Sequence, residues 1–302
     1  MKFAGIIAEY DPFHNGHAWQ LAQAKALGAE RVAVAMSCSL VQRGALPLLP
    51  EAVRTRSALT CGADLVFALP APCACAGAEA FARAGVALLA AAGCDGLVFG
   101  AETPDAALLM EAAELLDSDS YRAALKAQLA GGARSFAAAR QAAAAQLASD
   151  ERVAALLDKP NNNLAVEYCR AIRSLAPRME AYPLPRQGAN HGEALHSAHG
   201  QFASASALRK LWAEGGADAV APYVPEAVFP LYQEAYAAGQ YTDFSAAGRC
   251  ELALLRSACR GKAPFADIRG VSEGLEHRLE AAVRTSTTYD ELLDALTTVR
   301  YP

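Results

Sequence analysis

The sequence has no excess of positive charge, no paired-cysteine motif and no apolar run long enough to cross a membrane. It carries 27 Lys and Arg against 32 Asp and Glu, so the surface as a whole does not attract nucleic acid by its charge. A local basic patch is still compatible with this composition. The alanine-rich stretch 137–147 is interrupted by Arg140 and Gln141 and falls short of the ~20 apolar residues of a span. The N-terminus lacks the apolar length of a signal peptide. We therefore expect a cytoplasmic protein with no membrane contact.

The side chains that commonly bind metals are not spaced as metal ligands. None of the 8 cysteines forms a CxxC motif, and the close pair Cys73 and Cys75 has no histidine nearby. The histidines of the segment 191–199 follow the spacing H-x4-H-x2-H, with Glu193 as the sole carboxylate at ligand spacing. We expect reduced cysteines that act as small apolar residues, and no metal bound by either group.

Short apolar runs alternate with longer segments of helical periodicity, and 53% of the residues are hydrophobic. The helical segments 18–27, 51–61 and 78–92 are each followed by a glycine, as helix ends commonly are. The apolar runs are 3–8, 31–36, 64–69, 96–99 and 179–184. This alternation predicts an α/β fold with a doubly wound, Rossmann-like parallel sheet.

The rest of the chain is helical in character. Residues 104–158 are almost continuously helical with a break at Gly131-Gly132, which indicates a helical insertion before the last strand. A polar loop, 159–163, leads into a further helix, and the pattern after Gly215-Gly216 is wholly helical. We expect a sheet domain over 1–215 and a helical C-terminal region over 216–302.

The first strand leads into the motif His14-Asn15-Gly16-His17, with a helix expected from about His17. Ligands of doubly wound sheets sit at the carboxyl ends of strands, where helix N-termini offer free N–H groups to phosphate. Two imidazoles three residues apart can donate hydrogen bonds to an α-phosphate under attack, and Gly16 leaves room for a base or ribose. The alternative, a helix cap or metal pair, is less consistent with a strand–HxGH–helix order.

A second motif, Ser204-x-Ser206-x-x-Arg209, lies where a loop turns into a helix after the last strand. Ser206 suits an N-cap or a phosphate ligand at such a start. Arg209 can reach back over the first turn toward the β- and γ-phosphates of a departing pyrophosphate. The two motifs together predict a site that binds ATP and breaks it between the α- and β-phosphates.

Eight sequence blocks occur in the chain in the order GIIAEYDPFHNGH, MSCSLVQRG, ADLVFALP, VFGAE, KPNNNLAVEY, RQGANH, ASASALR and SEGLEHRL. In these blocks and their order the chain resembles the bacterial tRNA(Met) cytidine acetate ligases of the HxGH nucleotidyltransferase superfamily. It implies condensation of Mg²⁺-ATP with acetate to acetyl-adenylate, followed by acetyl transfer to the wobble cytidine of elongator tRNA(Met). Two alternatives stay open: adenylyl or cytidylyl transfer to a phosphorylated small molecule, and a nucleotide-binding paralogue without tRNA acetylation.

The resemblance also implies roles by position. The ATP site would be the segment 7–20, with His14, His17 and Arg209 as catalytic residues. Gln42 and Arg43 are candidates for binding acetate or tRNA. The alternative for Arg43 is a solvated arginine in a loop. Asn161 and Asn162 have the alternative of capping the following helix. The expected nucleotide contacts are Ile7, Tyr10, Asn15, Gly16, Gly100, Asn161, Asn162, Arg186, Ser204 and Ser206.

The chain departs from the family pattern at four places. Asp11 stands where the family usually has Asn, and Cys38-Ser39 stands where it has Gly-Asn or Gly-His. Glu51 stands where it usually has Lys, and Asn190 where it usually has Tyr. The family pattern also continues past Pro302, and residues 249–302 hold as many acidic as basic side chains. Because affinity for nucleic acid depends on clustered Lys and Arg, we expect tRNA binding by this chain to be weak. The alternative is one patch formed by Arg43, Arg54, Arg56 and the 260–262 turn.

Overall fold

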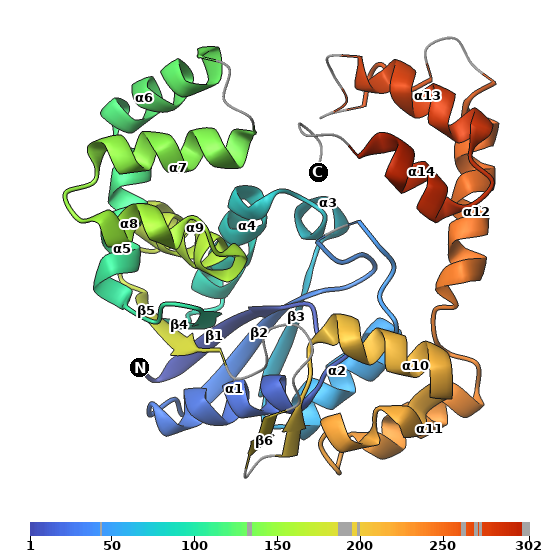
Figure 1. Cartoon of the computed structure of the whole chain (residues 1–302). Coiled ribbons are helices and arrows are strands. Elements are labelled where there is room, and N and C mark those ends of the chain that lie inside the picture. Colours follow the sequence, from blue (N-terminus) through green and yellow to red (C-terminus); the bar gives the residue numbers. More distant parts are fainter. Residues whose placement is uncertain are drawn as a thin grey trace.

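The computed structural model describes residues 1–42, 44–131, 135–186, 195–197, 200–260, 264–268, 271 and 274–297. At its centre is a parallel sheet of five strands in the order β3-β2-β1-β4-β5 (Figure 1). Its strands are β1 (Phe3–Ala8), β2 (Arg31–Ser37), β3 (Leu65–Leu69), β4 (Gly96–Ala101) and β5 (Glu180–Pro185). The chain winds from β1 outward to β3, then returns to the other side of β1 to add β4 and β5. The expected doubly wound α/β fold is confirmed.

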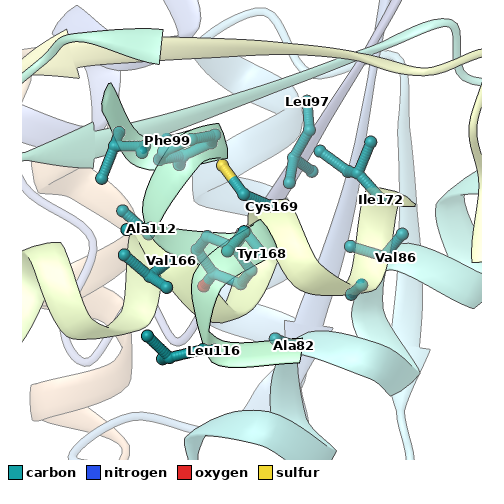
Figure 2. Packing of buried hydrophobic residues seen from close by; sticks show 14 of the residues in the cluster. Ala82, Val86, Leu97, Phe99, Ala112, Leu116, Val166, Tyr168, Cys169 and Ile172 are labelled. Carbon is teal, nitrogen blue, oxygen red and sulfur yellow. The ribbon is translucent and has the colours of Figure 1, made fainter. Parts of the chain in front are cut away.

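Helices cover both faces of the sheet, which is why its strands read as continuous apolar runs rather than alternating ones. Leu21, Val53, Leu208 and Tyr232 belong to the hydrophobic core on one face. That face is covered by α1 (Asn15–Ala26), α2 (Glu51–Thr60), α10 (Ala205–Ala219) and α11 (Phe229–Ala237). The other is covered by α4 (Ala78–Ala91), α5 (Ala106–Asp117) and α9 (Pro160–Leu175). Figure 2 shows Phe99 of β4 packed near Tyr168 of α9, with their ring centroids 5.4 Å apart.

Glycines end three of these helices as the sequence predicts. Gly28, Gly62 and Gly93 have φ of 96°, 102° and 91° and directly precede the segments that lead into β2, β3 and β4. A side chain is strained in this left-handed conformation, so glycine permits the chain to leave the helix and turn toward the sheet.

The helical insertion consists of α5, α6 (Asp119–Ala130), α7 (Phe136–Leu147) and α8 (Glu151–Leu156). Each begins after a residue whose side chain accepts a hydrogen bond from the first turn: Asp105, Ser118, Ser135 and Asp150. Such caps satisfy N–H groups that the helix itself leaves without acceptors. The insertion packs on α9, and its core is continuous with the sheet's second face.

The C-terminal helices are α12 (Phe244–Ala258), α13 (Leu275–Thr285) and α14 (Tyr289–Leu296), and their small core includes Leu252, Val283 and Leu292. They stand apart from the sheet on the side away from the insertion (Figure 1). Residues 217–235, in contrast, share a core with β1 and β2. We therefore propose that the helical C-terminal region begins near α12, rather than at Gly215-Gly216, where the sequence suggested a boundary.

Four short elements complete the described chain: α3 (Ala71–Ala74), the 3₁₀ turn η1 (Ala221–Tyr223) and the antiparallel strands β6 (Leu195–Ser197) and β7 (Gly200–Phe202). The β6–β7 pair overlaps the segment 191–199, and the histidine side chains of that segment fall outside those that the structure describes. Within the described chain, no helix has the length and apolar character to traverse a bilayer.

Candidate active site

A cavity of about 500 Å³ opens at the carboxyl ends of β1 and β4, where the winding of the sheet changes direction. This is where ligands of such sheets bind, and the volume lies within the ~300–1,000 Å³ of small-molecule pockets. Most of the residues predicted from the sequence line it: Ile7, Tyr10, His14, Gly16, His17, Gln42, Gly100, Asn161, Arg186 and Ser204. Asn15, Asn162, Ser206 and Arg209 do not, and Arg43 lies outside the described residues.

The two histidines of the HxGH motif are stacked, with ring centroids 3.7 Å apart and planes 20° from parallel. His14 is the N-cap of α1: its Nδ1 accepts a hydrogen bond from the Gly16 N–H at 3.0 Å. His17 completes a capping box, because its Nδ1 accepts from the His14 N–H at 3.3 Å. The helix therefore begins at Asn15, two residues before the expected His17.

These bonds fix the protonation of both rings. A ring nitrogen that accepts a hydrogen bond carries no proton, so each neutral imidazole keeps its proton on Nε2. Burial, with the nearby Arg186 charge, lowers the pKa of His14 to about 4, and burial and His14 lower the pKa of His17 as well. At neutral pH the pair therefore offers two neutral Nε2–H donors in the cavity that both rings line.

The same shifts predict that the protein loses stability as the pH falls below about 6.5. The folded-state pKa of His14 is about 4 against 6.5 when unperturbed, so between these values the unfolded chain binds more protons than the folded one. Urea unfolding at about pH 7 and about pH 5 should show a smaller free energy of unfolding at the lower pH. His14→Asn, which keeps a capping oxygen but does not titrate, should flatten this dependence. An equally steep dependence in the variant would contradict the assignment.

Gly16 is required by the histidine stack. A Cβ at this position would lie 2.9 Å from Cε1 and 3.1 Å from Nδ1 of His14, so any side chain displaces the ring. The sequence suggested that Gly16 makes room for a base or ribose, and Gly16 lines the cavity. We expect Gly16→Ala to weaken the ATP cleavage that the two motifs predict about tenfold or more, since overpacking costs about 1–3 kcal/mol. Gly77→Ala is the control, because nothing lies within 4 Å of its Cβ position, and equal activity of both variants would refute this role.

Arg186 is held over the cavity by a chain of polar contacts. Its guanidinium donates to the Asn161 side-chain oxygen, and the Asn161 amide donates to Glu102 at 2.6 Å. The Glu102 carboxylate also accepts from the N–H groups of Asn161 and Asn162, the first turn of α9. Burial raises the pKa of Glu102, but these hydrogen bonds outweigh it and lower the pKa overall. The expected polar loop at 159–163 is therefore the start of a helix, and Asn161 positions Arg186.

Two predicted nucleotide contacts, Asn15 and Asn162, have hydrogen-bond partners within the protein. Asn162 is 1% exposed; its oxygen accepts from the Thr103 N–H at 2.9 Å and its amide donates to the Thr103 hydroxyl at 3.1 Å. The Asn15 amide donates to the Pro222 carbonyl at 3.2 Å. These contacts join α9 to the end of β4 and α1 to η1, so both residues support the walls of the cavity.

The second motif forms the start of α10. Ser204 is the N-cap and accepts from the Ala207 N–H at 3.2 Å, while Ser206 is exposed in the first turn, with its hydroxyl 3.1 Å from that of Ser204. Ser204 and Ala205 line the cavity, so this helix N-terminus faces the same space as His14 and His17.

Arg209 is bound to Asp11, which lies three residues before the first motif. Its Nη1 donates to the Asp11 carbonyl at 2.7 Å and lies 3.1 Å from the Asp11 carboxylate. The buried Asp11 carboxylate also accepts from the Leu48 N–H at 2.6 Å. Burial raises the pKa of Asp11, although Leu48 and Arg209 counteract it. Asp11, a departure from the family pattern, therefore joins the two motifs through Arg209.

Arg54 is a residue whose role the sequence did not reveal. It is fully buried, and its guanidinium donates to the carbonyls of Leu49, Glu9, Ser37 and Cys38. These carbonyls belong to the ends of β1 and β2 and to the start of α2. Arg54 therefore ties together the loops that form one wall of the cavity, and it cannot belong to the exposed basic patch that the sequence left open.

Two further departures, Cys38 and Glu51, are neighbours. Burial, together with the Glu51 charge, raises the pKa of the Cys38 thiol to about 11, and burial raises that of Cys61 to about 11. Thiols with such values are protonated at neutral pH and poor nucleophiles. Their environment gives these cysteines no chemical role in the site.

Comparison with known proteins places these features in a family. The profile of the HIGH Nucleotidyl Transferase family matches residues 1–302. A tRNA(Met) cytidine acetate ligase of Syntrophotalea carbinolica is 36% identical over 299 residues, covering 98% of this chain and 70% of that protein. One of Bacillus velezensis is 34% identical over 309 residues, covering 100% of this chain and 73% of that protein. This chain belongs to the tRNA(Met) cytidine acetate ligases, within the HIGH nucleotidyl transferases.

Solved structures of this family have the same fold. Thermotoga maritima TmcAL without ligand superposes with a TM-score of 0.91 at 30% identity, covering 100% of this chain and 72% of that one. The same protein bound with alpha-thio ATP gives a TM-score of 0.89 at 29% identity and the same coverage. The family resemblance inferred from the eight sequence blocks is confirmed.

Proposed function

We propose that this chain is an ATP-dependent, acyl-adenylate-forming ligase. It condenses ATP with acetate to acetyl-AMP, releases pyrophosphate and transfers the acetyl group to the wobble cytidine of elongator tRNA(Met). The observation that carries the proposal is the stacked, neutral His14–His17 pair in the switch-point cavity. The tRNA(Met) cytidine acetate ligases among its relatives support acetate as the acid and tRNA(Met) as the acceptor, and the Thermotoga maritima protein bound with alpha-thio ATP supports ATP as the nucleotide.

In the first step, a carboxylate oxygen of acetate attacks the α-phosphorus and pyrophosphate leaves. The oxygens of the α-phosphate gain charge in the transition state, and neutral Nε2–H groups that are already oriented stabilise this charge without reorganisation. The free N–H groups at the start of α10 and the Arg186 guanidinium suit the phosphates that depart. This assigns activation to His14 and His17, and phosphate binding to Ser204 and Arg186.

Arg209 supports the phosphate site through Asp11 in the structure described here. Direct contact of its guanidinium with the β- and γ-phosphates would require it to share or exchange its bonds to Asp11. We propose that Arg209 fixes the start of α10 relative to the HxGH turn. Any direct contact of Arg209 with phosphate would be made while it is bound to Asp11.

Mg²⁺ would enter with the nucleotide. The described residues contain no cluster of three or more His, Cys, Asp or Glu side chains that could hold a metal ion. Mg²⁺ in such enzymes is held mainly by substrate phosphates and water with one or two carboxylates, and Glu9 and Asp11 are the carboxylates in the described cavity wall. When bound, the ion would neutralise phosphate charge.

A phosphorylated co-substrate, which the alternative nucleotidyltransferase function needs, fits the cavity less well. Beyond the histidines the wall is formed by Phe81, Phe99 and Tyr168, with the Glu9 carboxylate beside them. Such a wall suits a small acyl group and a planar base, and it would repel a second phosphate. We also propose a cytoplasmic location, in keeping with the tRNA substrate.

The test of this function is incubation of the full chain with Mg²⁺-ATP, acetate and elongator tRNA(Met), followed by mass spectrometry of the tRNA nucleosides. Acetylcytidine should form, and omission of ATP or acetate should abolish it. Formation of acetyl-AMP without acetylcytidine would support the activation of acetate by ATP and would contradict tRNA(Met) as the acetyl acceptor. Turnover that ignores acetate but requires a phosphorylated co-substrate would overturn both.

A further inference from the structure

One part of the cavity wall is apolar and lies on the side of α4 and α9. It is formed by Phe81, Phe99 and Tyr168, which belong to the hydrophobic core on that face of the sheet. The space that these three side chains border is called the apolar recess below. An apolar wall suits either an acyl group or a base, and the exposure of its rings distinguishes between the two.

The rings of the apolar recess offer too little surface to stack on a base. Phe81 is 2% exposed, Phe99 3% and Tyr168 4%, and the last two rings pack on each other with centroids 5.4 Å apart (Figure 2). A stacking platform needs a free ring face, whereas these residues present their edges at most. Because close-packed side chains do not move apart freely, the recess suits a group about the size of a methyl. The half-buried Trp19, which lines the cavity from α1, has more ring surface for a base.

The close packing of α4 on β1 brings Phe81 to the recess. A Cβ on Gly5 would lie 2.8 Å from the Leu89 side chain, and a Cβ on Gly85 would lie 2.5 Å from the Ile7 side chain. Residues two apart on a strand and four apart on a helix share a face, so these contacts form one row. The next helix position in the row is Phe81, which falls beyond the end of β1 and lines the cavity. Glycine at these crossings therefore sets how close the Phe81 ring lies to the strand end.

The geometry of the proposed reaction places the acid on this side of the cavity. The attacking and leaving oxygens lie roughly in line at the phosphorus in such a displacement. The departing pyrophosphate is assigned to the start of α10, a helix that packs on the same face of the sheet as α1. The carboxylate of acetate therefore approaches from the side of α4 and α9, and its methyl group points away from the phosphorus into the apolar recess.

We propose that Phe81 limits the length of the acyl group, and this proposal rests on the function proposed above. The Phe81 ring closes the apolar recess behind the methyl of acetate. A longer acid meets the ring before its carboxylate oxygen reaches the α-phosphorus. An apolar pocket of this kind discriminates by about 10–200-fold for one methylene. Phe81 is thus a specificity-determining residue for the acid.

The test is acid-dependent ATP–pyrophosphate exchange by the full chain, measured as kcat/KM for acetate, propionate and butyrate. Wild type should use butyrate at least about 100-fold less well than acetate, since butyrate has two more methylenes. Phe81→Val should raise the ratio of butyrate to acetate about 10–200-fold. Leu89→Ala is the matched control and should keep the ratio of wild type. It shortens a fully buried side chain of the same helix that is not among the described residues of the cavity wall.

A second measurement does not depend on turnover. The acetyl and butyryl forms of 5′-O-(N-acylsulfamoyl)adenosine are stable analogues of the acyl-adenylate, and calorimetry gives their affinities. Wild type should bind the acetyl form at least about tenfold more tightly than the butyryl form, and Phe81→Val should bind the butyryl form at least as well. Phe81→Leu, the milder substitution, replaces Phe81→Val if the latter does not fold, and should admit propionate first.

The outcomes separate this proposal from the proposed function. If the folded Phe81 variant keeps the acid preference of wild type, or if Leu89→Ala changes that preference as much, the proposal is overturned. Loss of ATP affinity at an unchanged acid preference would also overturn it, because the apolar recess would then hold the base. If no acid supports exchange by wild type, the proposed function fails, and the affinities for the two analogues still decide whether Phe81 limits the acyl group.

Discussion

His17→Ala is expected to reduce acetate-dependent ATP–pyrophosphate exchange about 10²–10³-fold, the range found when one oxyanion donor is removed. The imidazole is fixed from both sides: its Nδ1 accepts from the His14 N–H, and its ring stacks on His14 and contacts Tyr10 at a centroid distance of 4.8 Å. This fixed orientation is what allows Nε2–H to stabilise charge at the α-phosphate. Alanine removes the donor and leaves a cavity that water can enter.

The effect should fall on the rate of adenylate formation more than on ATP binding. Stabilisation of charge that develops only in the transition state changes kcat, whereas ground-state contacts change KM. His277→Ala is a suitable control, since this histidine lies on α13 with its side chain 81% exposed. Exchange by His17→Ala at the level of the control would remove the HxGH pair from the mechanism.

Arg54→Leu is expected to lower the free energy of unfolding by about 3–5 kcal/mol, as when one partner of a buried charged network is removed. Leucine fills part of the volume, but four carbonyls from three segments lose their donor in a site without exposure to solvent. Orphaned buried acceptors are costly because neither water nor protein replaces the lost bond. The loops at the ends of β1 and β2, which include Glu9, should then become more mobile.

Arg56→Leu provides the matched control on the same helix. Its guanidinium is 58% exposed and lies 3.7 Å from an exposed Glu234 carboxylate, a contact worth about 0–1 kcal/mol. Urea unfolding of the two variants compares a buried with an exposed arginine two positions apart. Equal stability of the two would show that the carbonyl network around Arg54 is not what holds these loops.

Much of the fold could be predicted because its signals are local. The five apolar runs became the five strands, with their ends shifted by no more than a few residues. Each run is bounded by glycine, proline or polar residues, and the strands β2 and β4 are almost entirely buried. Helix starts were harder. The sequence placed the first helix at about His17, but the imidazole of His14 caps it from Asn15, a role that serine, threonine, asparagine or aspartate usually fills.

The role of Arg54 could not be predicted, because it depends on carbonyls from separate loops that meet only in the folded chain. Arginine in a helix is normally exposed, and nothing in its neighbours distinguishes Arg54 from Arg56. Glu9 lies within the segment 7–20 that the resemblance placed at the ATP site, directly after the first strand and at the same sheet edge as the HxGH motif.

The Gly215-Gly216 pair, where the sequence suggested a boundary, lies at a bend inside α10. Gly216 has φ of 67°, and a Cβ there would lie 2.5 Å from the Tyr236 ring, so the glycine allows α11 to pack closely against a bend inside α10. Two adjacent glycines look like a linker in sequence. Here they serve close packing within one core, whose residues continue to Ala235.

We propose that acetate is activated at the α-phosphate of ATP, and the most direct test follows the carboxylate oxygen that attacks the phosphorus. Reaction with ¹⁸O-labelled acetate, Mg²⁺-ATP and elongator tRNA(Met) should produce AMP that carries one ¹⁸O atom, because the attacking carboxylate oxygen stays on the α-phosphorus when the acetyl group is transferred. Mass spectrometry of the AMP reads this directly. Unlabelled AMP, or the label in inorganic phosphate alongside ADP, would contradict the account.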